Sequence, residues 1–207
     1  MAMIECTNVD VSYGEHNVIK NFNGVFKEGT ISVLTGGNGA GKSTLLSTLA
    51  GDIPEFRGDI TIDGRSLRQI TSKELASLRS VATQHHSYWM TYSVFEILRL
   101  GHESLSKNRW ERVISAFAME KFIHQSITTL SGGQLQRVEI ARAFLRELPI
   151  VLLDEPFAAQ DSGSISRMKE FITGEAAGGW TIVMAAHARS EDLAWCDQVL
   201  ALPDKQT

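Results

Sequence analysis

The feature that most constrains the fold is a glycine-rich loop between an apolar run and an apolar helical pattern. Residues 31–34 read Ile-Ser-Val-Leu, residues 36–44 read Gly-Gly-Asn-Gly-Ala-Gly-Lys-Ser-Thr, and two leucines follow. A short apolar run bounded by turn residues is typical of a buried strand, and glycines allow the sharp turn that precedes a helix. This order of strand, loop and helix is the unit from which α/β folds are built.

The same loop predicts a site for ATP or GTP. Its glycines leave room for backbone N–H groups to surround an anion, and the following helix adds the positive end of its dipole. Lys42 can reach the β- and γ-phosphates, and the Ser43 hydroxyl can ligate Mg²⁺. The residues expected to contact the nucleotide are Gly36, Gly37, Asn38, Gly39, Ala40, Gly41, Lys42, Ser43 and Thr44. We therefore expect ATP and Mg²⁺ as cofactors.

The remaining apolar runs extend this unit into a sheet. Short runs at residues 60–62, 81–83, 150–153 and 182–186 are typical of strands, and helix-like stretches separate several of them. The alternation predicts an α/β fold, with a P-loop NTPase core around a mostly parallel sheet.

Two regions depart from this alternation. Residues 4–11 and 18–26 are strand-like pieces joined by turn residues, which predicts an N-terminal antiparallel β subdomain. Further along, apolar residues recur at helical spacing and predict an inserted α-helical subdomain. We expect one domain over residues 1–207, with the β subdomain and core at about 1–84 and 150–207 and the helical lobe at about 85–149.

Composition and charge exclude several classes of protein. The formal net charge is -4 and no cluster of basic residues is visible, which argues against a nucleic-acid partner. Cys6 and Cys196 have no paired spacing, so we expect two buried thiols in a reducing compartment. No segment approaches the roughly 18 apolar residues that a membrane span needs, and the first residues lack a signal-peptide pattern. We expect a cytoplasmic protein that contacts a membrane only through partners.

A second motif places two acids at the end of a strand. Residues 150–155 read Ile-Val-Leu-Leu-Asp-Glu, and ligands of open α/β sheets bind at the carboxyl ends of the strands. Asp154 can hold Mg²⁺, while Glu155 can polarise the water that attacks the γ-phosphate. Taken alone, the two acids are also explained by a solvated turn. With the glycine loop upstream, they predict hydrolysis.

A third motif, Leu-Ser-Gly-Gly-Gln at residues 130–134, stands before a helical pattern. Ser131 can cap this helix, and Gly132 and Gly133 can expose its first N–H groups to an anion. The residues alone do not distinguish a helix cap from a phosphate contact.

Together with Gln84 and His187, these motifs resemble the nucleotide-binding subunit of an ATP-binding cassette (ABC) transporter, over nearly the whole chain. The pentapeptide at residues 130–134 is the most specific element, because it separates ABC ATPases from other P-loop proteins. Chance agreement of all the motifs, in this order and with these separations, is negligible.

The resemblance implies a role for each motif residue. Tyr13 would stack on adenine, Gln84 would sense the metal and the attacking water, and His187 would hydrogen-bond the γ-phosphate. Catalysis would fall to Lys42, Gln84, Glu155 and His187, and the metal to Ser43, Gln84 and Asp154. Asp161 would lie in a loop that contacts a second subunit. Two positions depart from the family pattern, since Gln160 replaces its usual leucine and Ala188 its usual aspartate.

The resemblance also implies partners. Ser131, Gly132, Gly133 and Gln134 of one subunit would complete the phosphate site of another, which predicts a head-to-tail homodimer. Separate transmembrane permease subunits would dock between core and lobe, at the cytoplasmic face of the inner or cell membrane. Residues 85–92 are rich in aromatic side chains, and they could form this docking patch, belong to the core of the lobe, or hold a metal at the adjacent His85 and His86.

The spacing after Gln84 resembles importers of metal chelates, haem or vitamin B12. A small exporter, such as the haem-exporter subunit of cytochrome c maturation, is an alternative within the same class. A soluble ABC ATPase of translation or DNA repair is disfavoured, because the first type carries two cassettes in one chain and the second long coiled coils.

Overall fold

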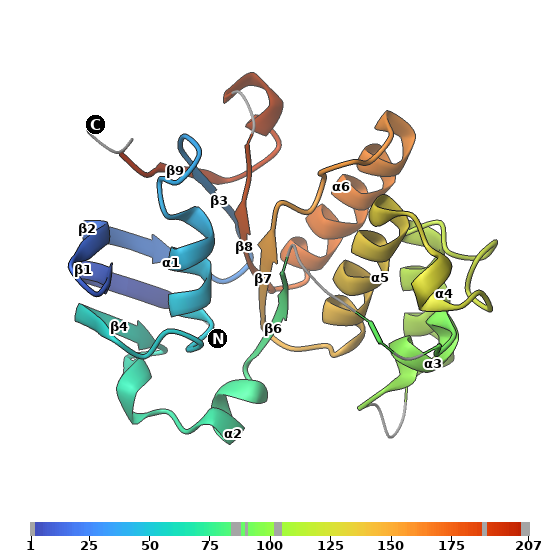
Figure 1. The fold of residues 1–207 in the computed structure, drawn as a ribbon, viewed down its shortest axis with the longest axis horizontal. Coiled ribbons are helices and arrows are strands. Elements are labelled where there is room, and N and C mark those ends of the chain that lie inside the picture. Colours follow the sequence, from blue (N-terminus) through green and yellow to red (C-terminus); the bar gives the residue numbers. More distant parts are fainter. Residues whose placement is uncertain (1–2, 84–87, 90, 102–104, 188–189, 204–207) are drawn as a thin grey trace.

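The structure is a computed structural model that describes residues 3–83, 88–89, 91–101, 105–187 and 190–203. Two sheets and a group of helices lie in layers (Figure 1). The predicted α/β fold is confirmed, with its parallel core sheet, its antiparallel β region and its inserted helices. The predicted division of the domain into lobes stays a prediction.

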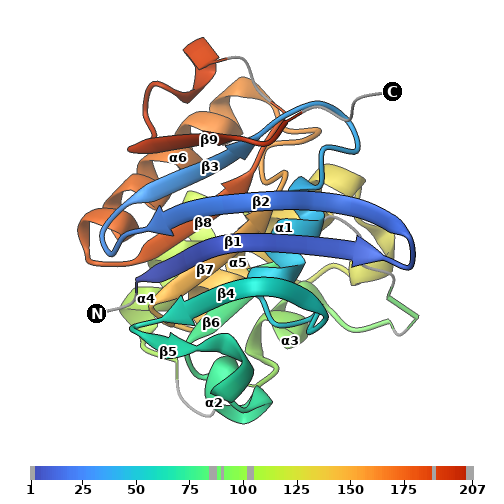
Figure 2. The same cartoon turned by 90° about the vertical axis from the view of Figure 1, so that its left-hand side faces the viewer.

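The antiparallel sheet has the strand order β2-β1-β4-β5. Its strands are β1 (Ile4–Tyr13), β2 (His16–Phe26), β4 (Phe56–Ile62) and β5 (Arg65–Ser66). Ile4, Cys6, Val9 and Val11 of β1 are buried, and the register shifts between Cys6 and Val9 keep these apolar side chains on the inner face. The sheet lies in front of the parallel strands in Figure 2. Strands β1 and β4 run further than the apolar pattern predicts.

The parallel sheet has the order β6-β7-β8-β3-β9. Its strands are β3 (Ile31–Thr35), β6 (Arg79–Ala82), β7 (Ile150–Asp154), β8 (Thr181–Ala185) and β9 (Gln198–Ala201). Continuous apolar runs form its central strands because both faces of the sheet are covered. On β7, Ile150 and Leu152 pack with α1 and the antiparallel sheet, whereas Val151 and Leu153 pack with the helices on the other side.

The helices are α1 (Lys42–Leu49), α2 (Ser72–Ala76), α3 (Val94–Arg99), α4 (Lys107–Ala116), α5 (Gly132–Leu145) and α6 (Ser162–Ala177). Short 3-10 turns cover Leu67–Gln69, Ile127–Thr129 and Ser190–Leu193. Helix α1 packs into the core shared with the antiparallel sheet, and α3 to α6 lie together on the far side of the parallel sheet (Figure 1). Within the described ranges, no helix is long and apolar enough to cross a membrane.

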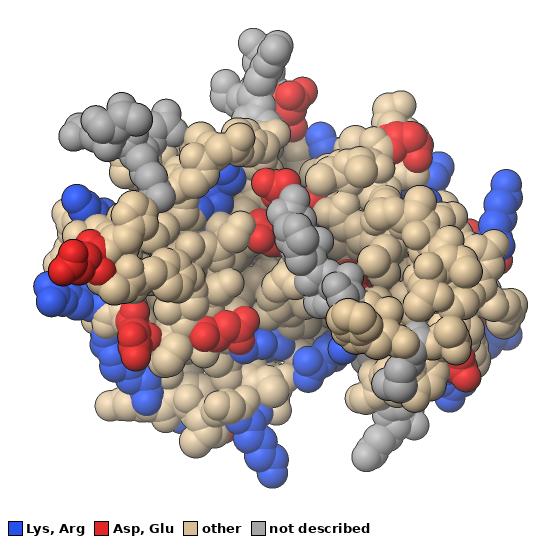
Figure 3. Space-filling view, viewed as in Figure 1, with Lys and Arg blue, Asp and Glu red and all other residues tan. Residues whose placement is uncertain are grey.

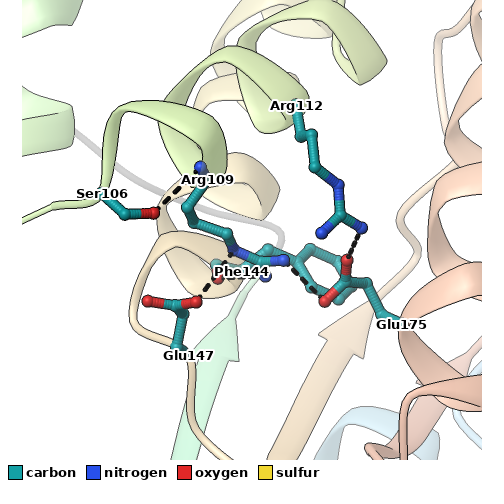
Figure 4. Close-up of polar contacts among 6 residues, drawn as sticks. All are labelled: Ser106, Arg109, Arg112, Phe144, Glu147 and Glu175. Carbon is teal, nitrogen blue, oxygen red and sulfur yellow. Dashed lines mark hydrogen bonds and ion pairs between the residues drawn. The ribbon is translucent and has the colours of Figure 1, made fainter.

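A buried ion pair joins α4 to α6 (Figure 4). The Arg109 Nη1 atom lies 2.7 Å from Glu175 Oε2, and Arg112 Nη2 lies 2.8 Å from the other carboxylate oxygen. Arg109 also donates a hydrogen bond of 2.6 Å to the Phe144 carbonyl at the end of α5. Three helices are therefore tied together at one point.

The two cysteines differ in burial. Cys6 is buried on β1, as predicted, but Cys196 is only half-buried, so the prediction of two buried thiols is wrong at that position. Cys196 packs against the edge of the helical core and lies in the chain that leads to the edge strand β9, where less of the protein covers it.

Candidate functional site

The phosphate loop, residues 36–44, connects β3 to α1. Gly36, Gly39 and Gly41 have φ angles of 143°, 77° and 96°, which favour glycine. A Cβ atom on Gly36 would lie 2.8 Å from the Leu202 carbonyl oxygen, and one on Gly41 would lie 2.5 Å from Ile19 Cδ1. Side chains at Gly36 and Gly41 would therefore collide with Leu202 and with β2, so the loop keeps this tight course only with glycine there. A glycine loop of this kind fits a bound phosphate chain.

Lys42 is the first residue of α1 and is held across the loop. Its side chain is buried, and Nζ donates hydrogen bonds of 2.8 Å to the Gly36 carbonyl and 3.0 Å to the Gly37 carbonyl. Ser43, which follows it, is exposed. A cation thus lies beside the N-terminal end of a helix, and both favour an anion there.

His187 contacts the phosphate loop from the end of the adjacent strand, β8. It follows β8, and its Nε2 atom lies 2.6 Å from Asn38 Oδ1. Strand β8 pairs directly with β3, so the carboxyl ends of these parallel strands bring the histidine and the loop together. Ala188 lies outside the described residues, so its predicted departure from the family pattern is not placed.

The acidic residues follow the neighbouring strand. Asp154 is the last residue of β7 and pairs with Ala185 of β8. Glu155 has a φ of 48°, a left-handed conformation unusual for this residue type, and its N–H donates a 2.9 Å bond to the Ala185 carbonyl. Glu155 and His187 line one hollow of about 160 Å³, together with Pro156, Phe157, Ala158 and Ala186. The structure thus brings two of the predicted catalytic residues to a common surface.

The residues present fit Mg²⁺ held jointly with phosphates. Among the described residues, no group of three or more His, Cys, Asp or Glu side chains could hold a metal. Mg²⁺ is commonly bound through one or two protein oxygens with the remaining positions taken by phosphates and water, and Ser43 and Asp154 are such donors. Gln84, the third predicted ligand, lies outside the described residues, as do His85 and His86.

The signature turn, residues 131–134, caps α5. The Gln134 N–H donates to Ser131 Oγ at 3.3 Å, and the Ser131 N–H donates to Gln134 Oε1 at 2.9 Å. This reciprocal pair is a capping box, so the helix-cap interpretation is confirmed. Ser131 and Gly132 remain exposed, so the turn is accessible at the surface of the protein.

Asp161 caps α6. Its Oδ1 atom accepts a 2.9 Å bond from the Ser164 N–H, and its Oδ2 accepts a 2.7 Å bond from the Ser164 hydroxyl. These bonds hold the pKa of the exposed Asp161 carboxyl below its usual value. The carboxylate therefore has a structural partner within its own chain.

Tyr13 ends β1, at the hairpin beside the phosphate loop. Its side chain is 55% exposed. The hairpin's second strand lies against the loop, since a Cβ atom on Gly41 would come within 3.2 Å of the Val18 carbonyl oxygen. Tyr13 thus lies on the hairpin whose second strand contacts the phosphate loop.

Two contacts of the site were not predicted from the sequence. The Gln136 side chain donates to the Glu155 carbonyl, and Gln160 Nε2 donates to the Gly133 carbonyl at 2.9 Å. Gly133 and Gln136 are three residues apart, which puts them on one face of α5. This spacing was the feature of the sequence that could have indicated a shared contact face. It does not reveal which segment of the chain that face contacts.

Comparison with known proteins shows which family the chain resembles. Residues 19–158 match the family model described as ABC transporter. The chain is 31% identical over 219 residues to the Hemin import ATP-binding protein HmuV of Pseudoalteromonas translucida (strain TAC 125), which covers 97% of this chain and 83% of that protein. It is 32% identical over 216 residues to the Ribose import ATP-binding protein RbsA of Bacillus subtilis (strain 168), which covers 99% of this chain but 44% of that protein.

Solved structures have the same fold. One described as the ATP binding subunit of an ABC transporter gives a TM-score of 0.84 at 27% identity, covering 97% of this chain and 85% of that chain. A bacterial Atm1-family ABC exporter with ATP bound gives a TM-score of 0.87 at 22% identity, covering 98% of this chain and 37% of that chain, a likeness of fold alone. The chain therefore belongs to the ABC transporter family, as an ATP-binding subunit whose ATPase activity is coupled to transport.

Proposed function

We propose that the chain hydrolyses ATP to drive an importer of haem, a metal chelate or a cobalamin-type substrate. The observation that carries the hydrolytic part is that His187 contacts the phosphate loop, which Lys42 braces, and also lines the adjoining hollow with Glu155. Proteins named for hemin import, at 31% and 32% identity over most of their length, favour the substrate class. The ribose import relative at 32% identity is the specific competitor.

In the proposed reaction, the phosphate loop and Lys42 bind and orient the phosphates of ATP. Ser43 and Asp154 would hold Mg²⁺, which supplies positive charge against the developing negative charge of the phosphates. Glu155 accepts a hydrogen bond from the attacking water, and His187 donates to the γ-phosphate from the position where it now contacts Asn38. Gln84 would complete the metal and water site, and Tyr13 would stack on adenine.

The working unit is proposed to be a head-to-tail homodimer. The exposed Ser131 and Gly132 at the start of α5 can donate backbone hydrogen bonds to phosphates bound by the partner. ATP bound between two such protomers favours the closed dimer because it contacts both, and hydrolysis removes that advantage. The dimer would work at the cytoplasmic face of a membrane.

Separate transmembrane subunits are proposed to dock near Trp89. This side chain is 92% exposed, whereas the neighbouring Tyr88 packs against the helical core and donates to Glu139 of α5. Tyr88 thus supports the core interpretation of this segment and Trp89 supports the docking interpretation. Through the Tyr88–Glu139 contact, a force on this segment can reach α5 and the signature turn, which forms the first residues of that helix.

The test of hydrolysis uses Glu155→Gln in the full chain. We expect ATP binding to persist while steady-state turnover falls by about 100-fold or more, because the acceptor for the water proton is lost. Glu170→Gln, at an exposed position on α6, is the matched control and should turn over normally. Normal turnover by the Glu155 variant would contradict the proposed mechanism.

The test of transport uses the purified complex of this chain with its permease in proteoliposomes. We expect ATP-dependent uptake of haem into the liposomes, and no uptake of ribose. Uptake of ribose alone would assign the chain to a sugar importer. Movement of haem in the opposite direction would support the exporter alternative. Co-purification with ribosomes and no membrane partner would support the soluble alternative.

A further inference from the structure

The side chain of Gln160 joins two parts of the site within one protomer. Its Nε2 atom donates a 2.9 Å hydrogen bond to the Gly133 carbonyl in the signature turn and lies 3.4 Å from the Ala158 carbonyl. Gln160 is half-buried, so this donor is held partly within the protein. A leucine at this position would have no donor for the Gly133 carbonyl.

The backbones of the two segments also touch. A Cβ atom on Gly133 would lie 2.6 Å from the Ala159 carbonyl oxygen, so the chain after Glu155 packs directly on the first turn of α5. Glu155 and Ala159 both have left-handed φ angles, of 48° and 54°. Such conformations persist where surrounding contacts hold them. Side-chain bonds from Gln136 to the Glu155 carbonyl and from Gln160 to the Gly133 carbonyl supply such contacts at both ends of the segment.

The bond costs α5 nothing. A helix carbonyl accepts one hydrogen bond from the N–H four residues later and keeps a second lone pair, which Gln160 can use at Gly133. Loss of the Gln160 donor therefore leaves the helix intact. Its effect should fall on the relative placement of the two segments, not on folding.

We propose that Gln160 is a positioning residue that fixes the signature turn and residues 158–161 as one surface, presented together to the second protomer. The proposal rests on the head-to-tail dimer proposed above. In that dimer, Ser131 faces the partner's nucleotide and Asp161 lies at the interface, directly after Gln160. A surface that is already fixed in the free protomer loses less conformational freedom on dimerisation, so the hydrogen bond strengthens ATP-dependent association.

The test measures dimerisation with ATP and Mg²⁺ in a Glu155→Gln parent by sedimentation across protein concentrations. Gln160→Leu removes the donor, and Gln160→Glu keeps the shape but turns a carboxylate toward the Gly133 carbonyl. We expect Gln160→Leu to weaken dimerisation by up to about 25-fold, from about fivefold for the one net hydrogen bond lost in each of the two protomers, and Gln160→Glu to weaken it at least as much. Gln125→Leu and Gln125→Glu, at an exposed position of the helical region, are the controls and should dimerise like the parent.

Two further readouts separate positioning from a general loss of structure. ATP affinity of dilute protomers and the thermal midpoint should match the parent in both Gln160 variants. With Glu155 intact, the protein concentration that gives half-maximal ATPase should rise while the plateau rate stays unchanged.

Unchanged or tighter dimerisation of the Gln160 variants, with a parent that dimerises, would overturn this inference alone. A fall in dimerisation matched by a fall in the thermal midpoint would also overturn it, because the side chain would then be structural. A parent that stays monomeric with saturating ATP and Mg²⁺ would overturn the proposed dimer as well.

Discussion

At the residue scale, the phosphate loop depends on the absence of a side chain at Gly41. Its φ is 96°, and a Cβ atom there would lie 2.5 Å from Ile19 Cδ1 and 2.9 Å from Val18 Cγ1. We expect Gly41→Ala to displace the loop and lower ATP affinity by about 10-fold or more, since the backbone donors would no longer converge on the phosphates. Equilibrium binding of a fluorescent ATP analogue measures this loss.

Gly64→Ala is the matched control for this prediction. Gly64 also has a positive φ, of 76°, but nothing lies within 4 Å of a Cβ atom there. Both substitutions place alanine in a left-handed conformation and destabilise the fold by about 1 kcal/mol. If both variants bound ATP equally well, crowding at Gly41 would not matter to the phosphate loop.

A second prediction at this scale concerns Cys6. Burial raises the pKa of its thiol to about 12, whereas a thiol of the unfolded chain titrates near about 8.5. Between these values the unfolded chain has released the proton and the folded chain keeps it. The Cys6 contribution to stability is therefore fully present at pH values below the pKa of the unfolded chain. Above that pKa, the free energy of unfolding falls by at most about 1.4 kcal/mol per pH unit.

Cys6→Ala should remove this alkaline slope. Urea unfolding at about pH 9 and about pH 11 should show a smaller loss of stability for the variant than for the wild type. Cys196→Ala keeps Cys6 and should retain the Cys6 contribution, although burial also raises the pKa of the Cys196 thiol, to about 11. Equal slopes for Cys6→Ala and wild type would contradict the assigned shift.

At the scale of elements, α4 and α6 are held together by a buried charge pair. Arg109 and Glu175 are both 5% exposed, and Arg109 also lies over the Trp180 ring at 4.8 Å. Glu175→Gln would leave the buried Arg109 charge with only the exposed Glu147 carboxylate, whose Oε1 lies 4.0 Å from Arg109 Nε. We therefore expect the free energy of unfolding to fall by about 3 to 5 kcal/mol. Urea denaturation measures this change.

A double variant, Arg109→Met with Glu175→Leu, tests the cause. Replacing both charges by apolar side chains of similar volume removes the desolvation penalty, so most of the lost stability should return. Arg112, which is 55% exposed in its side chain, can turn to solvent when Glu175 is absent. A double variant as unstable as the single one would show that packing, not the unpaired charge, sets the loss.

The sequence predicts elements best where burial is complete. Residues 150–153 form a continuous apolar run because the β7 strand is covered on both faces, and the pattern is visible in the chain. Strand β9 was not predicted, because its half-buried and exposed residues alternate at the sheet edge and the run is short. The pairs Arg109–Glu175 and Gly133–Gln160 join residues far apart in the chain, which no local pattern reveals.

In the candidate site, too, the sequence predicts some features and leaves others undetermined. Its motifs determine which residues follow β3, β7 and β8. The carboxyl ends of neighbouring parallel strands lie at the same edge of a sheet, so Glu155 and His187 are expected to lie close together from the topology alone. The left-handed Glu155 backbone and its bond from Gln136 depend on the packing of α5, which the sequence does not specify.

At the scale of the whole molecule, the surface has no single charge sign on the face drawn in Figure 3. Basic and acidic side chains are interspersed there among uncharged ones. A permease that bound this face would depend on shape and on apolar anchors more than on a charged field. Trp89, with 92% of its side chain exposed, is the most exposed large apolar residue among those the structure describes.

We therefore expect Trp89→Ala to weaken assembly with the transmembrane subunits and to abolish the rise in ATPase rate that assembly and substrate produce. Basal ATPase, ATP affinity and the thermal midpoint should stay unchanged, because the side chain has few contacts in its own chain. Leu100→Ala is the control, since Leu100 is another large apolar side chain, 52% exposed, at the end of α3. Assembly and stimulation of the Trp89 variant at the wild-type level would exclude this residue as an anchor, because a central aromatic anchor is commonly worth about 2 kcal/mol or more.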